Sequence, residues 1–216
     1  VLGGAFAGAL FVIVIILLLA TLLRNNMFLL IAGVAVSYMT SSAITLLNYF
    51  STAEGVHSYM IWGMGSFCGV AMSQMPFFAP VTLVLLMVSL ALAKPLNALL
   101  LGDAYAANLG VNVKAVRAVA LCVTGLLTAV VTAFCGPVSF IGLAVPHVAR
   151  MLLGTSNHKH LVPVTILSGS CIAMLCNMLT VIPSSNSMLP LNAVTPMIGA
   201  PIIIYVILNR KNLQYF

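Results

Sequence analysis

The sequence has few charged residues, and only two of them are acidic. Of its 216 residues 5% are charged, eight Lys or Arg against two Asp or Glu, while 62% are hydrophobic. A soluble domain carries about 25% charged residues, so this composition cannot cover a water-facing globular surface. The net charge of +6 comes from cations spread along the chain, without the basic patch that binds nucleic acid. Composition therefore excludes soluble enzymes and nucleic-acid binders and indicates a polytopic membrane protein.

The sequence also lacks the residue patterns of common enzyme chemistry. Its two acids, Glu54 and Asp103, fall on opposite sides of the topology described below and cannot form an acid–base pair. There is no glycine-rich phosphate loop with a lysine, which excludes ATP hydrolysis by that route. The five cysteines have no C-x-x-C spacing; a Cys68–Cys135 disulfide is allowed, but we favour free thiols. We expect a protein that is not an enzyme and has no cofactor or metal of its own.

Long apolar runs divide the chain into predicted membrane-spanning helices. About 20 residues at a rise of about 1.5 Å cross a hydrocarbon core of about 30 Å. We expect seven spans within one transmembrane domain, residues 1–216, the fifth being short because Gly136-Pro137 precedes it. The predicted fold is an all-α polytopic bundle. Its spans lie at residues 5–23, 28–47, 81–98, 115–135, 141–153, 161–181 and 193–208.

Two segments between the spans are expected to be helical without crossing the membrane. Residues 48–80 have an apolar, glycine-rich middle that contains Tyr59 and Trp62. We interpret it as a re-entrant or interfacial helix, since these aromatic residues favour the headgroup level. Residues 99–114 are too polar to span, and their small residues alternating with leucine favour a short helix–turn–helix. By pattern alone, a plain amphipathic connector is the favoured interpretation of this second segment.

All eight cations fall on one side of the predicted topology. They are Arg24, Lys94, Lys114, Arg117, Arg150, Lys159, Arg210 and Lys211. The opposite side, residues 48–80, 136–140 and 182–192, contains no Lys or Arg. Because cytoplasmic loops carry an excess of cations, the cation-bearing side and the C-terminus are predicted to be cytoplasmic. Residue 1, a valine, then lies outside, which favours the C-terminal portion of a longer protein over a processed N-terminus.

Histidines are the remaining candidates for chemistry. His147 and Arg150 share a helical face at i, i+3, and we favour an ordinary cation near a helix end over a proton relay. The run 158–160 (His-Lys-His) has no carboxylate or cysteine partner for a metal, so we interpret it as a solvated turn. The alternative function is an intramembrane haem- or metal-handling enzyme using His57 or His147, although the topology places these two on opposite sides.

Several motifs occur in the order typical of one transporter family. They are Leu29–Val34, Trp62–Ser66, Leu101-Gly102-Asp103 with Ala106 and Leu109-Gly110, Gly136–Leu143, Pro146-His147 with Arg150, Leu189-Pro190, Val194-Thr195 and Ile198–Pro201. On these residues the chain resembles the FecCD-type permeases of ABC importers for iron–siderophore complexes, haem and cobalamin. Members usually have ten spans, so the chain resembles spans four to ten with the first three missing.

The resemblance implies a permease subunit of a binding-protein-dependent ABC importer in the inner membrane. Such a subunit works as a homodimer or a pair of related permeases, with cytoplasmic ATP-binding subunits and an extracytoplasmic substrate-binding protein. Alternating access driven by the ATPases would move an iron–siderophore or related metal-chelate complex into the cytoplasm. A transport-incompetent permease fragment is a further alternative.

The resemblance also implies roles for individual residues. Residues 101–110 become the segment that couples to the ATPase, in place of a plain connector, at Leu101, Gly102, Asp103, Ala106, Leu109 and Gly110. Gate and pathway positions are Asn26, Met27, Gly33, Trp62, Gly65 and Ser66. Structural motif positions are Gly136, Pro137, Phe140, Gly142, Pro146, His147, Arg150, Gly199 and Pro201.

The chain departs from the family pattern near its last span. The family often has an Asp and, four residues later, an Arg before the Leu-Pro motif, whereas this chain has Asn177 and Val181. The family's Arg can pair with a Glu of the binding protein, so docking here is expected to use Glu54 and His57, or the missing N-terminal part, instead. The glycine usual after Leu-Pro-x is replaced by Asn192.

Overall fold

The structure is a computed structural model that describes residues 2–22, 26–181 and 189–208. Arg24, Arg210 and Lys211 lie outside these ranges, and so does the predicted cytoplasmic C-terminus. The described residues are almost entirely helical and include no strand, which confirms the predicted all-α class. The helices are α1 Leu2–Leu22, α2 Asn26–Tyr49, α3 Ala53–Met64, α4 Met75–Ala91, α5 Ala93–Leu100, α6 Asp103–Asn108, α7 Val113–Cys135, α8 Ile141–Leu153, α9 His158–Val181 and α10 Leu191–Leu208, with short 3-10 turns at Phe67–Gly69 and Met72–Gln74.

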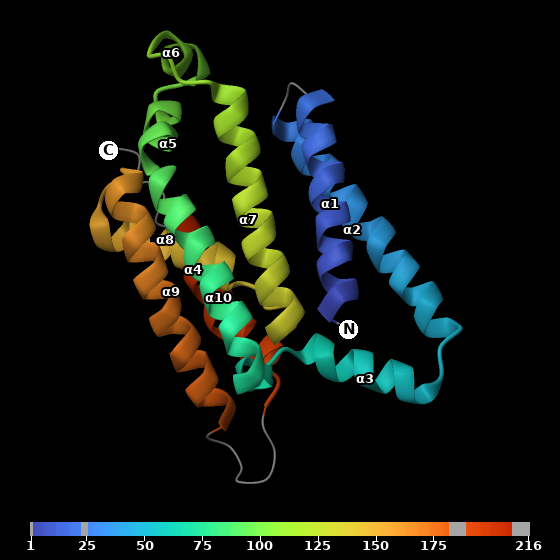
Figure 1. Cartoon of the computed structure of the whole chain (residues 1–216). Helices are drawn as coiled ribbons and strands as arrows, with labels where there is room; N and C mark the ends of the chain where they lie inside the picture. The colour runs from blue at the N-terminus through green and yellow to red at the C-terminus, as the bar shows by residue number, and fades with distance from the viewer. Residues whose placement is uncertain (1, 23–25, 182–188, 209–216) are drawn as a thin grey trace.

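The long helices run between two distinct ends of the molecule (Figure 1). At one end α6 caps the α5–α7 connection, and we call it the α6 end. At the other end α3 lies across the direction of α1, α2 and α7, and we call it the α3 end. Helix α3 begins at Ala53 and ends at Met64, followed by two 3-10 turns; its re-entrant or interfacial position stays a prediction.

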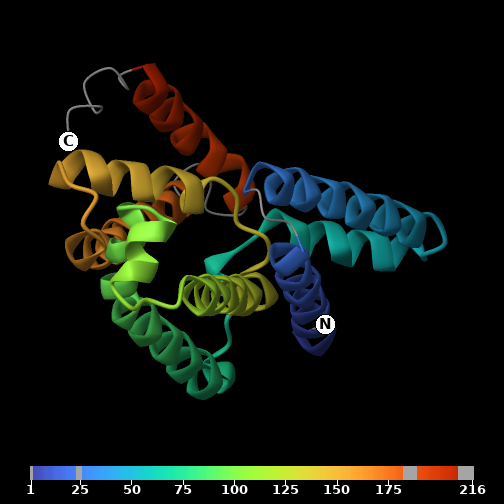
Figure 2. The same ribbon diagram turned by 90° about the horizontal axis from the view of Figure 1, so that it is seen from above.

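Helix α7 is the central element of the fold. Figure 2 shows it end-on, with α1 on one side and α4 on the other. A side chain at Gly125 would come within 2.6 Å of Ile13 Cγ1, so the glycine lets α1 approach closely. The buried residues of α7 and α8 are mostly small, which permits close packing of helices whose outer faces are apolar: Val123, Ala129, Val130, Ala133 and Cys135 on α7, and Ala144, Val145 and Ala149 on α8.

Several helices have the length and composition of membrane spans. Among the described residues, Met27–Tyr49, Met72–Ala91, Val113–Cys135 and His158–Val181 are long and apolar enough to cross. Phe6–Ala20, Ile141–Leu153 and Leu191–Val206 are shorter apolar helices. The 13 residues of α8 extend only about 20 Å at about 1.5 Å per residue. Each of the seven apolar runs found in the sequence thus contains a helix, and whether each crosses the membrane stays a prediction.

The region predicted as a single span at residues 81–98 has a different shape. Helix α4 begins already at Met75 and ends at Ala91, and α5 starts after Leu92. Pro95 has no N–H to donate to the carbonyl of Ala91, which explains the break. Pro76 lies in the first turn of α4, where a missing N–H costs nothing. The helix within residues 81–98 is therefore interrupted at Leu92, and whether these residues form a single span stays a prediction.

Candidate functional site

The α5–α6 segment forms a compact projection at the α6 end. Gly102 has φ 103°, a conformation that favours glycine, and α6 begins directly after it. Ala106 is fully buried and fixes α6 against its neighbours, whereas Leu101 and Leu109 are 65% and 59% exposed. Gly110, with φ 81°, ends the turn that leads to α7. The segment therefore combines a fixed backbone with exposed apolar side chains.

An ion pair joins α6 to α7. Arg117 Nη2 donates to both carboxylate oxygens of Asp103, at 2.9 and 3.0 Å. Both side chains are about half exposed, so solvent screens the pair and its contribution to stability is small, about 0.2–1 kcal/mol. Its geometric effect is direct, since the first residue of α6 is held by the second turn of α7.

An asparagine joins α5 to the start of α9 at the same end. Asn97 Oδ1 accepts hydrogen bonds from the backbone N–H of His158 at 2.7 Å and from His158 Nδ1 at 2.9 Å. Asn97 Nδ2 donates to Asn157 Oδ1 at 2.7 Å. The first N–H groups of a helix have no intrahelical acceptor, so Asn97 satisfies one of them from another helix. The α5–α6 projection is thereby connected to α9 as well as to α7.

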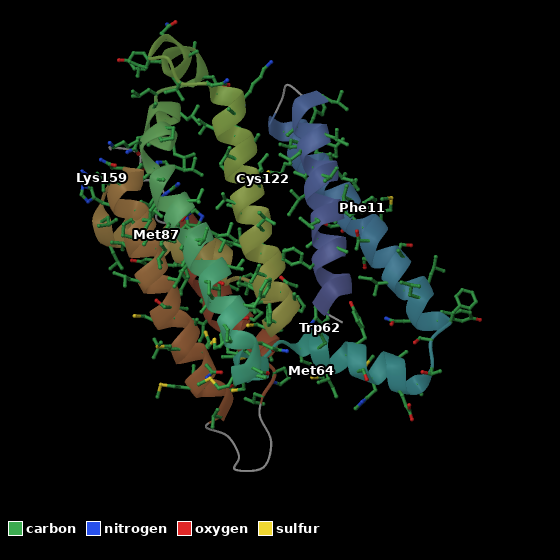
Figure 3. The ribbon with its side chains drawn as sticks, in the orientation of Figure 1. Phe11, Trp62, Met64, Met87, Cys122 and Lys159 are labelled. Carbon is green, nitrogen blue, oxygen red and sulfur yellow. The ribbon has the colours of Figure 1, made fainter. Side chains whose placement is uncertain are left out.

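The segment after α2 is organised by its caps. Thr52 caps α3 by accepting from the N–H of Gly55 at 3.3 Å. At the other end α3 stops at Gly65, which has φ 72°. Figure 3 shows Trp62 and Met64 where α3 meets the end of α7. None of the residues of α3 is buried, so apolar packing along its length does not fix its position.

Three segments far apart in the sequence meet at the α3 end, and we call this contact the α3 junction: residues 62–66, 135–139 and 190–192. Ser66 N donates to Cys135 O at 2.9 Å, and Leu191 N donates to Gly65 O at 3.4 Å. A Cβ at Gly136, where φ is 78°, would collide with Trp62 O and lie 3.1 Å from Gly65 Cα. The backbones therefore touch directly, and glycine is required at Gly136.

The side chain of Asn192 lies at the centre of the α3 junction. Its Nδ2 donates to Gly63 O at 2.9 Å and to Pro137 O at 2.5 Å. Its Oδ1 accepts from Ser139 N at 3.1 Å and from Ser139 Oγ at 3.2 Å. The sequence marked Asn192 only as a departure from a family glycine, and nothing in it identifies these four partners.

The start of α8 is close to α10. Phe140 precedes α8 with φ 67°, which is unusual for a residue other than glycine. A Cβ at Gly199 would lie 2.8 Å from Phe140 Cβ, so Gly199 allows α10 to pass this turn. Gly142, by contrast, has open space around it. Close packing therefore explains why Gly136, Phe140 and Gly199 stand at their motif positions, whereas it does not explain the glycine at Gly142.

The remaining predicted site residues are dispersed over the described structure. Glu54 and His57 are exposed on α3, and Met27 and Gly33 are on α2, where Met27 is 71% exposed. The side chain of Asn26 lies outside the described part. Pro146, His147 and Arg150 are on α8, and Pro201 is on α10. Their proposed roles stay predictions.

No metal site is formed by the described residues. Among them, no group of three His, Cys, Asp or Glu residues is close enough to hold a metal ion. His57 on α3 and His147 on α8 lie on separate elements, so the haem- or metal-enzyme alternative has no geometric support there. The five cysteines, Cys68 and Cys135 included, are free thiols.

Comparison with known proteins identifies the family. The model of the FecCD transport family matches residues 1–209. The chain belongs to the FecCD transport family. It is 34% identical over 210 residues to the vitamin B12 import system permease protein BtuC of Citrobacter koseri and 35% identical over 210 residues to that of Photorhabdus laumondii. These matches cover 96% and 97% of this chain but 62% of each relative, so the chain spans about three fifths of their length.

A solved structure with a similar fold supports the helical arrangement. It is described as an inward-facing conformation of an ABC transporter assigned to the metal-chelate type, and it aligns with a TM-score of 0.87 at 30% sequence identity. The alignment covers 96% of this chain and 68% of the other. The helical arrangement of this FecCD chain is therefore a multi-pass membrane fold shared with solved transporters.

Proposed function

We propose that this chain acts as the transmembrane permease subunit of a binding-protein-dependent ABC importer. The cargo would be an iron–siderophore or related metal-chelate complex, moved into the cytoplasm by alternating access. The similar permeases carry the name of a vitamin B12 import system, and vitamin B12 is itself a bulky cobalt chelate. ATP hydrolysis would take place in separate partner subunits.

The positions of the charged residues support an orientation for the α6 end. Five cations lie within the described ranges: Lys94 on α5, Lys114 and Arg117 on the first two turns of α7, Arg150 in the last turn of α8 and Lys159 in the first turn of α9. Those elements meet at the α6 end, where Figure 3 labels Lys159. By the positive-inside rule this end would face the cytoplasm, and α3 with Glu54 would lie on the outer side.

The observation that carries the proposal is the α5–α6 projection. Leu101 and Leu109 are exposed on a segment that is tied to α7 by Asp103–Arg117 and to α9 by Asn97. A cytoplasmic ATPase that holds these apolar side chains would move the segment, α7 and α9 together. Through these rigid connections, closure of the ATPase subunits would be converted into movement of the helices around the transport pathway.

A second permease copy fits the surface of α2. Within the described part of α2 no side chain is buried, and large apolar residues such as Leu30 and Tyr38 are 69% and 75% exposed. We infer that two copies form the pathway between them, with Met27 and Gly33 at its inner part. The binding protein would approach the outer end, where Glu54 and His57 are exposed.

The experiment is uptake and ATP hydrolysis by the full-length permease reconstituted with its ATPase and its substrate-binding protein. Vitamin B12 and a ferric hydroxamate siderophore are the first cargo probes. Leu109→Ala and Gly102→Ala should reduce uptake per ATP hydrolysed by about tenfold, because the first removes an exposed contact and the second disfavours the turn at φ 103°.

Leu167→Ala is the matched control, since Leu167 is 65% exposed on α9, away from the projection. It should couple like wild type. Wild-type uptake per ATP hydrolysed in both projection variants would overturn the role of this segment. If the wild-type assembly imports neither metal chelate at the expense of ATP, the proposed function itself is overturned.

A further inference from the structure

The amide of Asn192 uses all of its hydrogen-bonding capacity within the α3 junction. An asparagine side chain has two N–H donors and two acceptor lone pairs. The donors reach Gly63 O and Pro137 O, and the acceptor sites receive Ser139 N and Ser139 Oγ. Such complete use of a half-buried amide ties three segments to one side chain.

The partner on α3 is a group that the helix itself leaves unpaired. Helix α3 ends at Met64, so the carbonyl of Gly63 belongs to the last turn, whose carbonyls have no intrahelical donor. Asn192 Nδ2 supplies that donor from α10. On the other side, the same nitrogen and the oxygen hold Pro137 and Ser139 of the α7–α8 connection.

The direction of α3 depends on this turn. No residue of α3 is buried, and its contacts with the rest of the bundle are concentrated at its end, where Trp62 O faces Gly136. Glu54 lies nine residues before Gly63 in the same helix, about 13 Å away at about 1.5 Å per residue. A small tilt at the junction therefore moves the Glu54 end by several times the displacement at Gly63.

We infer that Asn192 is a positioning residue that fixes α3, with Glu54 and His57, for the partner that docks on the α3 end. It acts through the last turn of α3. The identity of that partner as a substrate-binding protein rests on the proposed function, whereas the control of α3 by Asn192 does not.

The first test measures hydrogen exchange in the full-length protein in lipid nanodiscs, with no partner or cargo added. Asn192→Ala should speed exchange of peptides 62–66 and 135–139 by at least about fivefold, which corresponds to loss of about 1 kcal/mol of hydrogen bonding. Asn192→Asp retains acceptors for Ser139 but puts a carboxylate oxygen against Gly63 O and Pro137 O. It should therefore speed exchange in 62–66 while the Ser139 amide stays protected.

Asn97→Ala is the matched control, because Asn97 also bridges distant segments, at the α6 end. It should leave exchange of residues 62–66 at the wild-type rate. Equal acceleration of 62–66 by Asn97→Ala, or no acceleration there by Asn192→Asp, would overturn the inference.

The second test separates an effect on the position of α3 from a general loss of folding or turnover. In the reconstituted transporter, ATP hydrolysis is titrated with the binding protein loaded with the chelate that the wild-type assembly imports. Asn192→Asp should raise the KM for the loaded binding protein about fivefold or more, with kcat within about twofold of wild type, as expected for a residue that affects docking and not turnover. A fall in kcat at unchanged KM contradicts the inference. If the loaded binding protein does not stimulate ATP hydrolysis by the wild-type transporter, the proposed function is contradicted. The hydrogen-exchange experiment still tests the role of Asn192 in that case.

Discussion

The two ends of this molecule each use an asparagine to connect segments that are distant in sequence, but they use it in different settings. At the α6 end, Asn97 connects α5 to the start of α9, two helices that already pack against each other. At the α3 end, Asn192 connects the last turn of α3 to the α7–α8 connection, where backbones meet without a packed helix pair.

The difference indicates what holds each end. Where helices pack along their sides, apolar contact supplies most of the stability and a hydrogen-bonded amide only sets the register of the two helices. Where the end of α3 meets the α7–α8 connection and the start of α10, glycines and a fully bonded amide fix the backbone contacts, beside an apolar cluster of Cys176, Leu191 and Val194. The α3 end should therefore be far more sensitive to single substitutions than the α6 end.

The largest effect is expected at Gly136. Gly136→Ala places a Cβ against Trp62 O at a positive φ, and we expect a loss of about 3–5 kcal/mol in unfolding free energy. Denaturant unfolding of the full-length protein in detergent measures it. Gly142→Ala is the matched control, because Gly142 lies within α8 with open space around it, and it should be neutral or stabilising by up to about 1 kcal/mol. Equal losses of unfolding free energy for both variants would show that the backbone contact at the α3 junction is not what makes Gly136 sensitive to substitution.

Asn192→Ala should follow, with a loss of about 3 kcal/mol. The substitution removes four hydrogen bonds and leaves Gly63 O and Ser139 N without the partner they have in the fold. The same unfolding experiment measures it. If Asn192→Ala has the same unfolding free energy as wild type, water replaces the amide at no cost. The comparison between the two ends would then fail.

Asn97→Ala should cost less, about 1–2 kcal/mol. Its partners are near the exposed 154–157 turn, so water can replace part of what the amide provides. The α5–α9 packing remains in the variant. The informative quantity is the difference between Asn192→Ala and Asn97→Ala under identical conditions, and a larger loss for Asn97→Ala would reverse our interpretation.

Asp103→Asn should have the smallest effect on stability, about 0.5 kcal/mol. The Asp103–Arg117 pair is half exposed and screened by solvent. The loss should be measurable at low ionic strength and disappear at high ionic strength, since salt screens exposed charges. An effect of equal size at both ionic strengths would show that the pair acts through its shape and not through its charge.

Much of the fold follows from the apolar pattern. Each of the runs from residues 5–23 to 193–208 contains a helix, and an interfacial helix was expected between residues 48 and 80. The break at Leu92 was missed, although Lys94, Pro95 and Asn97 interrupt the apolar run there. A proline inside an apolar run is compatible with either a kink or a new helix, and the neighbouring helices decide between them.

The candidate site was predicted less completely. Leu101, Gly102 and Leu109 were identified from their motif, and the structure places them on an exposed projection. Arg117 was noted only as a cation, and Asn97 and Ser139 were not singled out. Their partners are 14, 60 and 53 positions away in the sequence, and a single sequence has no local signal for contacts at such separation.

The amino-acid sequence by itself determined the class of this protein. A composition with 5% charge and long apolar runs permits only helices that satisfy their own backbone hydrogen bonds in a membrane. The order of glycine and proline motifs was sufficient to indicate the FecCD family.

Only the tertiary structure decided which polar groups hold the two ends together. The physical reason is that helices form from local interactions, whereas the partners of Asn97, Arg117 and Asn192 depend on how whole helices are placed against one another. In an apolar protein with few polar side chains, those few bonds decide the position of the elements that partners contact.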